Sequence, residues 1–275
     1  MKMPGNIKTW SLATLPLAIL GYVLFSTASD REPRYEMAQA TPDQGIEIRQ
    51  KIFGYSEAGK EIMGYEIGNG DDGLFLFAAI HGNEMGTADL MNELIEEIKA
   101  DPNLVSPKKR LVIIPIANPD GYYDRVDKLN ANEVNLNLNF KTIEWQQYGA
   151  EGTFAGEDPF SEKESQVIKR IVEQYRPNMM IAFHSQGALV SPEEGESSVR
   201  LGKWYADKTG YEYFDEWDFH GTATRWFWEI TGKPAITVEL TDHMESDWEI
   251  NKEALLELIS SNITQFVTEE MPNFD

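Results

Sequence analysis

The sequence predicts an α/β fold in which a twisted sheet carries helices on both faces. Apolar runs that are typical of buried strands alternate along the chain with amphipathic stretches that are typical of helices. Three of the apolar runs end at or near a residue that can bind a metal or move a proton: His81, His184 and Glu239. Because ligands gather at the carboxyl ends of the strands in such sheets, we expect the functional site at that edge.

The first half of the folded chain predicts four strands and one helix. Residues 46–53 and 61–67 alternate apolar and polar side chains, as half-buried strands do. Residues 73–80 are continuously apolar and predict a buried strand, and residues 87–99 then place their apolar side chains on one helical face. A second continuous apolar run, residues 110–117, predicts another buried strand.

The second half begins with a long polar stretch, residues 122–160, that has little periodicity. A loop of this length inside a compact domain is usually functional. We expect Ser161 to cap the next helix, with Glu164 completing a capping box. The remaining elements are predicted as helices at 161–175, 198–209, 222–231 and 248–268, and as buried strands at 178–183 and 235–240.

Composition excludes several classes of site. The 275 residues have 41% hydrophobic content, which is ample for a globular core, and they include no cysteine. Disulfides, zinc–thiolate centres and thiol nucleophiles are therefore excluded. The net charge of -22 makes the chain a poor binder of nucleic acid, so we expect no nucleic-acid partner.

The N-terminus has the pattern of an export signal. Lys2 and Lys8 precede an apolar stretch, residues 10–28, that ends in the small residues of a cleavage site. The same stretch is long enough to remain as a membrane anchor, in which case the N-terminal segment contacts the membrane. Both readings predict an extracytoplasmic protein that is periplasmic, secreted or anchored facing outward. We therefore expect a signal peptide or anchor (1–28), a linker (29–44) and one catalytic domain (45–275).

A metal-binding pattern follows the buried strand that ends at residue 80. His81 and Glu84 lie three residues apart on a predicted tight turn, so both side chains can reach one ion. His184, at the end of another buried strand, would complete a His2Glu set, which binds zinc and leaves a fourth position for water. The alternatives are a solvated Glu84 in the first turn of a helix and a His184 that is satisfied within the core.

Glu239 is a candidate general base. It interrupts an otherwise apolar strand at residues 235–240, where an unpaired carboxylate is costly to bury. A carboxylate that takes a proton from an activated water has a reason to be in such a place. The alternative is a residue at the strand end that reaches solvent.

Together these residues resemble the zinc carboxypeptidases, the carboxypeptidase A-like metallopeptidases. The resemblance implies a single three-layer α/β/α domain around a mixed, mostly parallel sheet, and a peptide substrate. It also implies one zinc ion on His81, Glu84 and His184, with Glu239 as the general base. The matching segments occur in family order: Ser56-Glu57-Ala58-Gly59-Lys60, His81-Gly82-Asn83-Glu84, Asn118-Pro119-Asp120-Gly121, Val134-Asn135-Leu136-Asn137-Leu138-Asn139-Phe140, His184-Ser185 and Thr237-Val238-Glu239-Leu240.

The chain departs from the family pattern where that pattern binds substrate. The family has an arginine at the position of Leu138, and that arginine grips the substrate's C-terminal carboxylate together with an asparagine, here Asn137. Asparagine also replaces the family's aspartate at Asn135. Leucine cannot replace a bidentate carboxylate clamp. By resemblance, Asn137 remains a substrate-binding residue.

Three cationic residues are candidates for the two positive charges that family arginines provide. The oxyanion-stabilising arginine of the family falls on Lys128, which can stabilise an oxyanion as a point charge. Arg125 is the alternative if the loop is arranged differently. Arg225, in a segment that resembles the family's substrate pocket, is expected to bind substrate in place of the lost arginine, unless it is a solvated helix residue.

Within the family, the chain looks most like the bacterial murein-peptide amidases and the D,L- or L,D-type carboxypeptidases. These enzymes cut amide bonds next to diaminopimelate or D-glutamate in the peptides of peptidoglycan. We therefore expect a zinc-dependent amidase or carboxypeptidase that acts on cell-wall (murein) peptides. The alternatives are a small-molecule amide deacylase, like the aspartoacylase and desuccinylase relatives, and a catalytically inactive peptide-binding module.

Overall fold

The computed structural model describes residues 45–149 and 152–262, except for the side chain of Arg125. The predicted signal peptide or anchor and the linker lie outside the described residues, as does the end of the last predicted helix. Within the described ranges, no helix is both long and apolar enough to cross a membrane.

One mixed sheet organises the described part of the chain, in the order β1-β2-β4-β3-β5-β8-β6-β7. Its strands are β1 (Ile48–Tyr55), β2 (Glu61–Ile67), β3 (Asp72–Phe77), β4 (Lys109–Ile114), β5 (Met179–Ser185), β6 (Leu189–Pro192), β7 (Glu212–Tyr213) and β8 (Ala235–Leu240). The helices are α1 (Met85–Ala100), α2 (Lys163–Tyr175), α3 (Glu196–Thr209), α4 (Ala223–Thr231) and α5 (Trp248–Ser260). Short helical turns cover Pro102–Leu104, Gly121–Arg125 and Leu136–Leu138.

The centre of the sheet is parallel, as the sequence predicts. Strands β4, β3, β5 and β8 run parallel, whereas β1 and β2 add an antiparallel edge and β6 pairs antiparallel with β8. The parallel register sets His184 on β5 directly beside Glu239 on β8. The carboxyl ends of the central strands therefore meet at one edge of the sheet.

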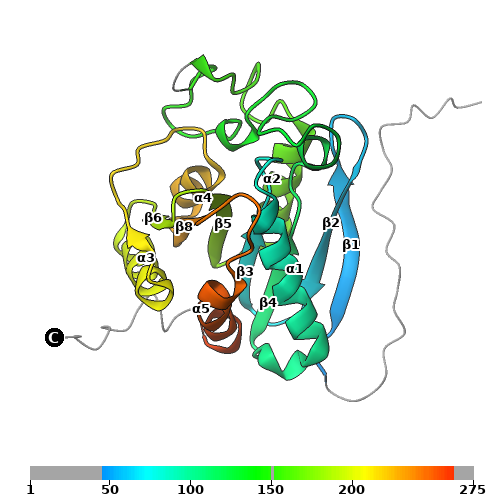
Figure 1. The fold of residues 1–275 in the computed structure, drawn as a ribbon, viewed down its shortest axis with the longest axis vertical. Coiled ribbons are helices and arrows are strands. Elements are labelled where there is room, and N and C mark those ends of the chain that lie inside the picture. The colour runs from blue at the N-terminus through cyan, green and yellow to red at the C-terminus, as the bar shows by residue number, and fades with distance from the viewer. Residues whose placement is uncertain (1–44, 150–151, 263–275) are drawn as a thin grey trace, which may run out of the picture. The chain divides into compact units, whose positions relative to one another are not determined.

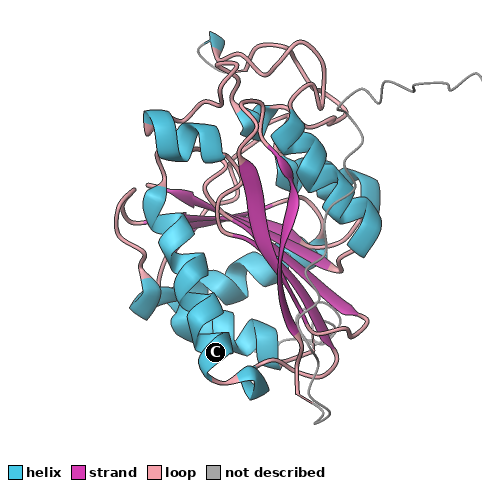
Figure 2. Cartoon of the chain, turned by 90° about the vertical axis from the view of Figure 1, so that its right-hand side faces the viewer, coloured by secondary structure: helices cyan, strands magenta, loops and turns pink. Residues whose placement is uncertain are grey.

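Helices cover both faces of the sheet, which gives three layers (Figures 1 and 2). Apolar side chains of α1, α3 and α5 pack with alternate strand residues in one core, which includes Leu94, Leu201 and Leu255. Those of α2 and α4 pack on the other face in a second core, which includes Ile168 and Phe227. The predicted α/β/α fold with helices on both faces is confirmed.

The sequence reading missed two strands and one helix start. Strands β6 and β7 are too short for a periodicity signal, and β6 ends in a proline. The predicted capping box is wrong: Glu162 is the N-cap of α2, and it makes no side-chain capping bond. Instead, Ser161 Oγ donates to Glu162 Oε1 at 2.7 Å, and Glu164 Oε1 accepts from the backbone N–H of Glu57 at 3.2 Å. These side chains stabilise a loop junction rather than the helix end.

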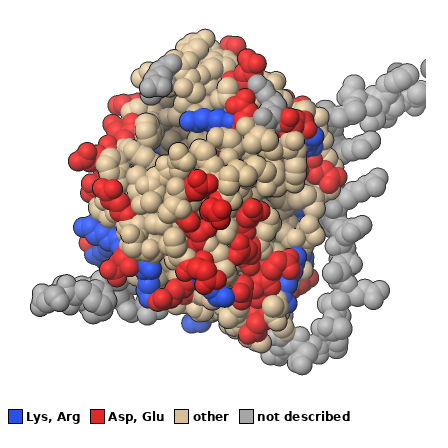
Figure 3. Space-filling model, in the orientation of Figure 1, with Lys and Arg blue, Asp and Glu red and all other residues tan. Residues whose placement is uncertain are grey.

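Acidic side chains gather over the helices of one face (Figure 3). They include Asp89, Glu93 and Glu96 on α1, which line a shallow groove together with Trp248 at the start of α5. This distribution agrees with the strongly negative net charge of the chain.

Candidate functional site

The loop after β3 holds His81 and Glu84 in a fixed arrangement. Ala79 has a left-handed backbone with φ of 44°, and its N–H donates to Thr87 Oγ1 at 3.0 Å. The same hydroxyl donates to the carbonyl oxygen of Glu84 at 2.6 Å, which ties the loop to the start of α1. Gly82 is required here because a Cβ would lie 2.2 Å from the carbonyl carbon of Gly121.

His81, Glu84 and His184 form a buried cluster. The Nδ1 atom of His81 lies 2.8 Å from Glu84 Oε1, and the Nδ1 atom of His184 lies 3.0 Å from Glu84 Oε2. One ligand atom from each residue lies within 4.8 Å of the others. Glu84 is only 4% exposed, so the alternative of a solvated Glu84 is wrong. Burial alone would raise the pKa of Glu84, but the two imidazoles outweigh it and hold that pKa well below its ordinary value.

Asn135 fixes the orientation of His81. Its Oδ1 atom accepts from the backbone N–H of Asn137 at 3.1 Å, which identifies this atom as the oxygen. The same Oδ1 lies 3.0 Å from Nε2 of His81 and accepts its hydrogen, so Nδ1, which lies against Glu84, is the ring nitrogen left to bind a metal ion. This hydrogen bond favours the tautomer that a metal ion at Nδ1 requires.

Asn137 contacts the other imidazole. Its Oδ1 accepts from the backbone N–H of Ala223 at 3.3 Å, and its Nδ2 lies 3.3 Å from Nε2 of His184. The proton of His184 therefore lies on Nδ1, facing Glu84. A metal ion that binds at Nδ1 of His184 would replace this proton, which is the usual linkage between metal binding and proton release.

The cluster fits a zinc ion. Two imidazoles and one ionised carboxylate converge from the loop after β3 and from the end of β5, and the Nε2 atom of each imidazole has its own partner. Zinc in catalytic sites takes three protein ligands of this kind and leaves the fourth position open. His81, Glu84 and His184 would therefore hold the metal.

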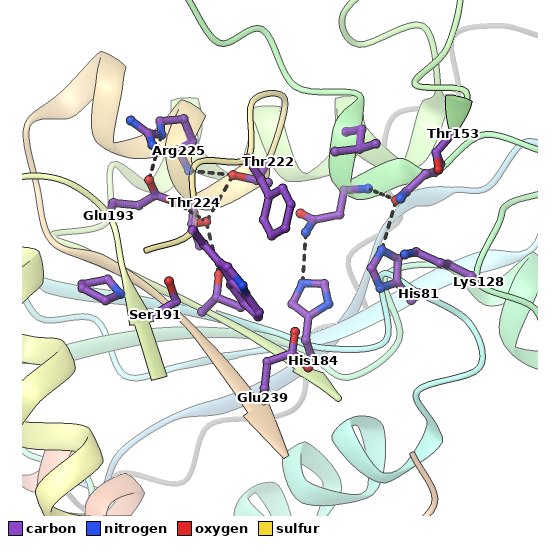
Figure 4. Close-up of a pocket in the computed structure, with 17 residues that line it drawn as sticks. His81, Lys128, Thr153, His184, Ser191, Glu193, Thr222, Thr224, Arg225 and Glu239 are labelled. Atoms are coloured by element: carbon purple, nitrogen blue, oxygen red, sulfur yellow. Dashed lines mark hydrogen bonds and ion pairs between the residues drawn. The ribbon is translucent and has the colours of Figure 1, made fainter. Parts of the chain in front are cut away.

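Glu239 and Lys128 line the same cavity as the two histidines, a cavity of about 300 Å³ (Figure 4). Burial raises the pKa of Glu239 to about 7, and Glu84 adds to the increase, while His184 and Lys128 oppose it. A carboxylate with a pKa near neutrality is suited to accept and return a proton. Lys128 is exposed at its position on the long loop before α2.

The wall away from the histidines is made by α4 and by the chain that follows β6. Figure 4 shows Arg225, Glu193 and Thr224 together there, on the other side of the cavity from His81 and Lys128. Leu138 and Asn137 also line the cavity, and Trp217 and Phe219 contribute aromatic surface. The sequence-predicted residues His81, Glu84, His184, Glu239, Lys128, Asn137 and Arg225 thus come together, whereas the side chain of Arg125 lies outside the described part of the chain.

The comparisons with known proteins identify the family. A family model described as Zinc carboxypeptidase (Peptidase_M14) matches residues 36–199, more than half of the chain. The chain belongs to the zinc carboxypeptidase family. The matched range contains the three candidate zinc ligands, and the family is one of zinc-dependent metallopeptidase hydrolases.

Two curated relatives are similar to this member of the family. It is 27% identical to bacteriocin BCN5 of Clostridium perfringens over 259 residues, which is 85% of this chain and 28% of that protein. It is 28% identical to murein peptide amidase A of Escherichia coli K12 over 148 residues, which is 50% of this chain and 57% of that protein. The matched part is less than two thirds of the length of either relative.

Solved structures show the same fold as this chain. Bovine thrombin-activatable fibrinolysis inhibitor, solved with tick carboxypeptidase inhibitor, superposes with a TM-score of 0.69 at 16% identity, covering 82% of this chain and 92% of that one. The murein-tripeptide amidase MpaA from Escherichia coli O157 superposes with a TM-score of 0.59 at 21% identity, covering 76% and 91%. At these identities, the likeness shows the fold alone.

The sequence did not predict two residues of this candidate site. Asn135 was noted only as a departure from the family's aspartate, although its amide oxygen binds His81. Glu193 follows β6 and lines the cavity, yet the sequence around it reads as a plain loop. The one feature of the sequence that could have indicated a role for Glu193 is the adjacent pair of acidic residues, Glu193 and Glu194, after a proline.

Proposed function

We propose that this chain is an extracytoplasmic zinc amidase that hydrolyses an amide bond in cell-wall (murein) peptides. The observation that carries the proposal is the common cavity of the His81–Glu84–His184 cluster and Glu239. The similarity to murein peptide amidase A of Escherichia coli supports the substrate class.

Different residues of the cavity have different roles in amide hydrolysis. A zinc ion held by the cluster would supply Lewis-acid activation of water and of the scissile carbonyl. Glu239 then takes the proton from the attacking water, and later gives it to the leaving amine. Asn135 keeps His81 in the metal-binding tautomer throughout, because its amide oxygen binds the Nε2 hydrogen.

Lys128 and Asn137 provide polar contacts to the substrate. The ammonium group of Lys128 supplies a positive charge near the developing oxyanion. Asn137 lies between His184 and the backbone of Ala223, so its amide reaches both the metal ligands and the start of α4. Lys128 and Asn137 would together orient the scissile bond, and neither requires a free C-terminus.

The charges in the cavity favour an amidase over an exopeptidase that grips a C-terminal carboxylate. Leu138 occupies the position of the family's carboxylate-binding arginine. Arg225 contacts the carboxylates of Glu193, Glu194 and Asp218, so its charge is already balanced. A role for Arg225 in binding a terminal carboxylate stays a prediction that the assay below tests.

The export pattern at residues 1–28 supports an extracytoplasmic location, where cell-wall peptides are found. If the segment is not cleaved, it would anchor the protein at the membrane. Fusing a reporter to the chain with and without residues 1–28 tests this, and reporter signal in the cytoplasm from both fusions would contradict it.

One assay tests the proposed activity against its alternatives. The full chain is purified, its zinc content is measured, and it is incubated with defined muropeptides and with ordinary peptides that have free C-termini. We expect cleavage of muropeptides only, and none by Glu239→Gln. Loss of the last residue from ordinary peptides would instead indicate an exopeptidase. Cleavage only of acylated amino acids would indicate a deacylase. No cleavage despite bound zinc would indicate a binding module.

A further inference from the structure

The end of the cavity away from the histidines is built from charged and hydroxyl side chains. Glu193 and Arg225 lie there with the hydroxyl groups of Thr222 and Thr224, and Ser191 and Thr237 line the same wall. In Figure 4, Ser191, Glu193, Thr224 and Arg225 lie on the opposite side of the cavity from His81 and Lys128. A wall of this composition selects a polar group rather than an apolar side chain.

The backbone holds this wall in place. Glu193 N–H donates to the carbonyl oxygen of Ala235 on β8 at 3.0 Å, so the residue after β6 is anchored to the central sheet. Thr222 Oγ1 caps α4 by accepting from the N–H of Arg225 at 3.2 Å, and the guanidinium of Arg225 lies 5.8 Å from the ring centre of Trp228. Both charged side chains are therefore positioned before a substrate arrives.

Three carboxylates surround Arg225, and only that of Glu193 also lines the cavity. The guanidinium of Arg225 makes three ion pairs. Its Nε lies 3.0 Å from Oε2 of Glu193, its Nη1 lies 2.9 Å from Oε1 of Glu194, and its Nη2 lies 3.0 Å from Oδ1 of Asp218. The side chain of Glu193 is only 12% exposed, whereas those of Glu194 and Asp218 are 66% and 72% exposed. Glu194 and Asp218 thus bind the guanidinium from its exposed side, and Glu193 is the one of the three carboxylates that faces the cavity.

The charges and hydroxyl groups at this end of the cavity favour one of three kinds of substrate side chain: a carboxylate, an apolar group or an ammonium group. An incoming carboxylate would compete with three carboxylates for one guanidinium. An incoming apolar side chain would cover hydroxyls and charges without replacing their hydrogen bonds to water. An ammonium group would find the carboxylate of Glu193, which accepts one hydrogen bond from Thr224 Oγ1 at 2.7 Å and has further acceptor capacity.

We propose that Glu193 is a specificity-determining residue, which binds the ammonium group of a substrate residue whose side chain ends in a primary amine. The inference rests on the proposed amide hydrolase function and names the side chain that this cavity accepts. Burial raises the pKa of Glu193 to about 7 in the free protein, so a bound cation would also favour its ionised form.

Binding of three amino acids of similar length tests the proposal without requiring turnover. Lysine, norleucine and α-aminoadipate end in an ammonium group, a methyl group and a carboxylate. Their binding to the zinc-loaded full chain is measured by calorimetry. We expect lysine to bind at least about 30-fold more tightly than norleucine (about 2 kcal/mol), and α-aminoadipate to bind most weakly.

Variants at two neighbouring carboxylates show which of them causes the preference for lysine over norleucine. Glu193→Gln should remove the preference for lysine over norleucine while leaving norleucine binding unchanged. Glu194→Gln removes a carboxylate from the same guanidinium at an exposed position, so it is the matched control and should change the preference by less than about threefold. If Glu193→Gln does not fold, as judged by its zinc content and circular dichroism, the comparison of ligands on the unmodified chain still decides.

The outcomes separate this proposal from the proposed function. Equal binding of lysine and norleucine, absence of binding by either, or tighter binding of α-aminoadipate would each overturn the role of Glu193. A selective binder that cleaves no muropeptide would keep the ammonium site and overturn the amidase activity. If muropeptides are cleaved, kcat/KM for substrates that differ only in a free or acetylated side-chain amine should fall about 30-fold on acetylation.

Discussion

Replacing Asn135 tests whether its amide oxygen prepares His81 for a metal ion. Asn135 is 4% exposed, and its Oδ1 atom accepts hydrogen bonds from Nε2 of His81 at 3.0 Å and from the N–H of Asn137 at 3.1 Å. Asn135→Leu keeps a similar volume and removes the acceptor. The Nε2 hydrogen of His81 is then buried without a partner, which costs about 1–3 kcal/mol.

We expect this change to weaken zinc binding. Removing a hydrogen-bond partner of a metal-ligating histidine lowers metal affinity by about 10–100-fold, or about 1.4–2.7 kcal/mol. This range overlaps the cost of the unpaired Nε2 hydrogen. The zinc dissociation constant is measured by competition with a chelator of known affinity, and the thermal midpoint of the metal-free protein is recorded beside it.

Asn135→Asp is the matched control. A carboxylate oxygen at this position accepts the same two hydrogens and adds charge, so zinc affinity should be kept or increased. Zinc affinity of Asn135→Leu within threefold of the unmodified chain would refute the reasoning. An equal loss in both variants would show that the amide NH2 group, which both variants lack, matters and the acceptor oxygen does not.

Further predictions concern the general base, the oxyanion and one buried carboxylate. Glu239→Gln should lower kcat by about 10²–10⁴-fold with unchanged zinc content. Burial raises the pKa of Glu239 to about 7, and only the ionised carboxylate is a base, so kcat/KM should decrease as the pH falls below about 7. A bound zinc cation stabilises the ionised carboxylate and can only move this decrease to lower pH. A decrease that begins above pH 8 would contradict the assignment of Glu239 as the base. Lys128→Ala should lower kcat by about 10²–10³-fold with little change in zinc affinity, and Lys128→Arg should restore most of it. Burial also raises the pKa of Glu164 from its ordinary value of 4.5 to about 7, so the folded state binds this proton more tightly and loses stability as pH rises through that interval. Relative to the unmodified chain, Glu164→Gln should therefore gain up to about 3 kcal/mol of unfolding free energy between pH 4.5 and pH 8, measured by urea titration, and a constant difference would refute it.

The part of the site that the sequence predicted is the part carried by buried strands. Apolar runs placed β3, β5 and β8 within a few residues, because a strand buried on both faces needs continuous apolar side chains. His81, His184 and Glu239 stand out because each interrupts or ends such a run. Parallel strands bring their carboxyl ends to one edge, so these three residues were predictable as neighbours before any contact was known.

The part that the sequence did not predict depends on pairings between distant segments. Glu193 reaches the cavity because β6 turns back antiparallel to β8, and a four-residue strand that ends in proline gives no usable periodicity. Asn135 acts through one hydrogen bond across 54 residues of sequence, within a loop that has little regular structure. Such contacts follow from tertiary packing, which local patterns do not encode.

Asn137 contacts both the metal cluster and the start of α4, which are at opposite ends of the cavity. The chain can therefore differ from the family pattern near Arg225 while it keeps the metal ligands. The Nδ2 atom of Asn137 lies beside His184 in the metal cluster, and its Oδ1 binds the N–H of Ala223, two residues before Arg225 on α4. On the metal side, Asn135 keeps the acceptor that a family aspartate would provide, so its replacement preserves the hydrogen bond to His81. On the recognition side, Leu138 brings no cation, and three carboxylates already pair with Arg225. In the proposed amidase, a substitution that preserves a hydrogen bond therefore keeps the metal site, and one that changes the charge alters which substrate that site receives.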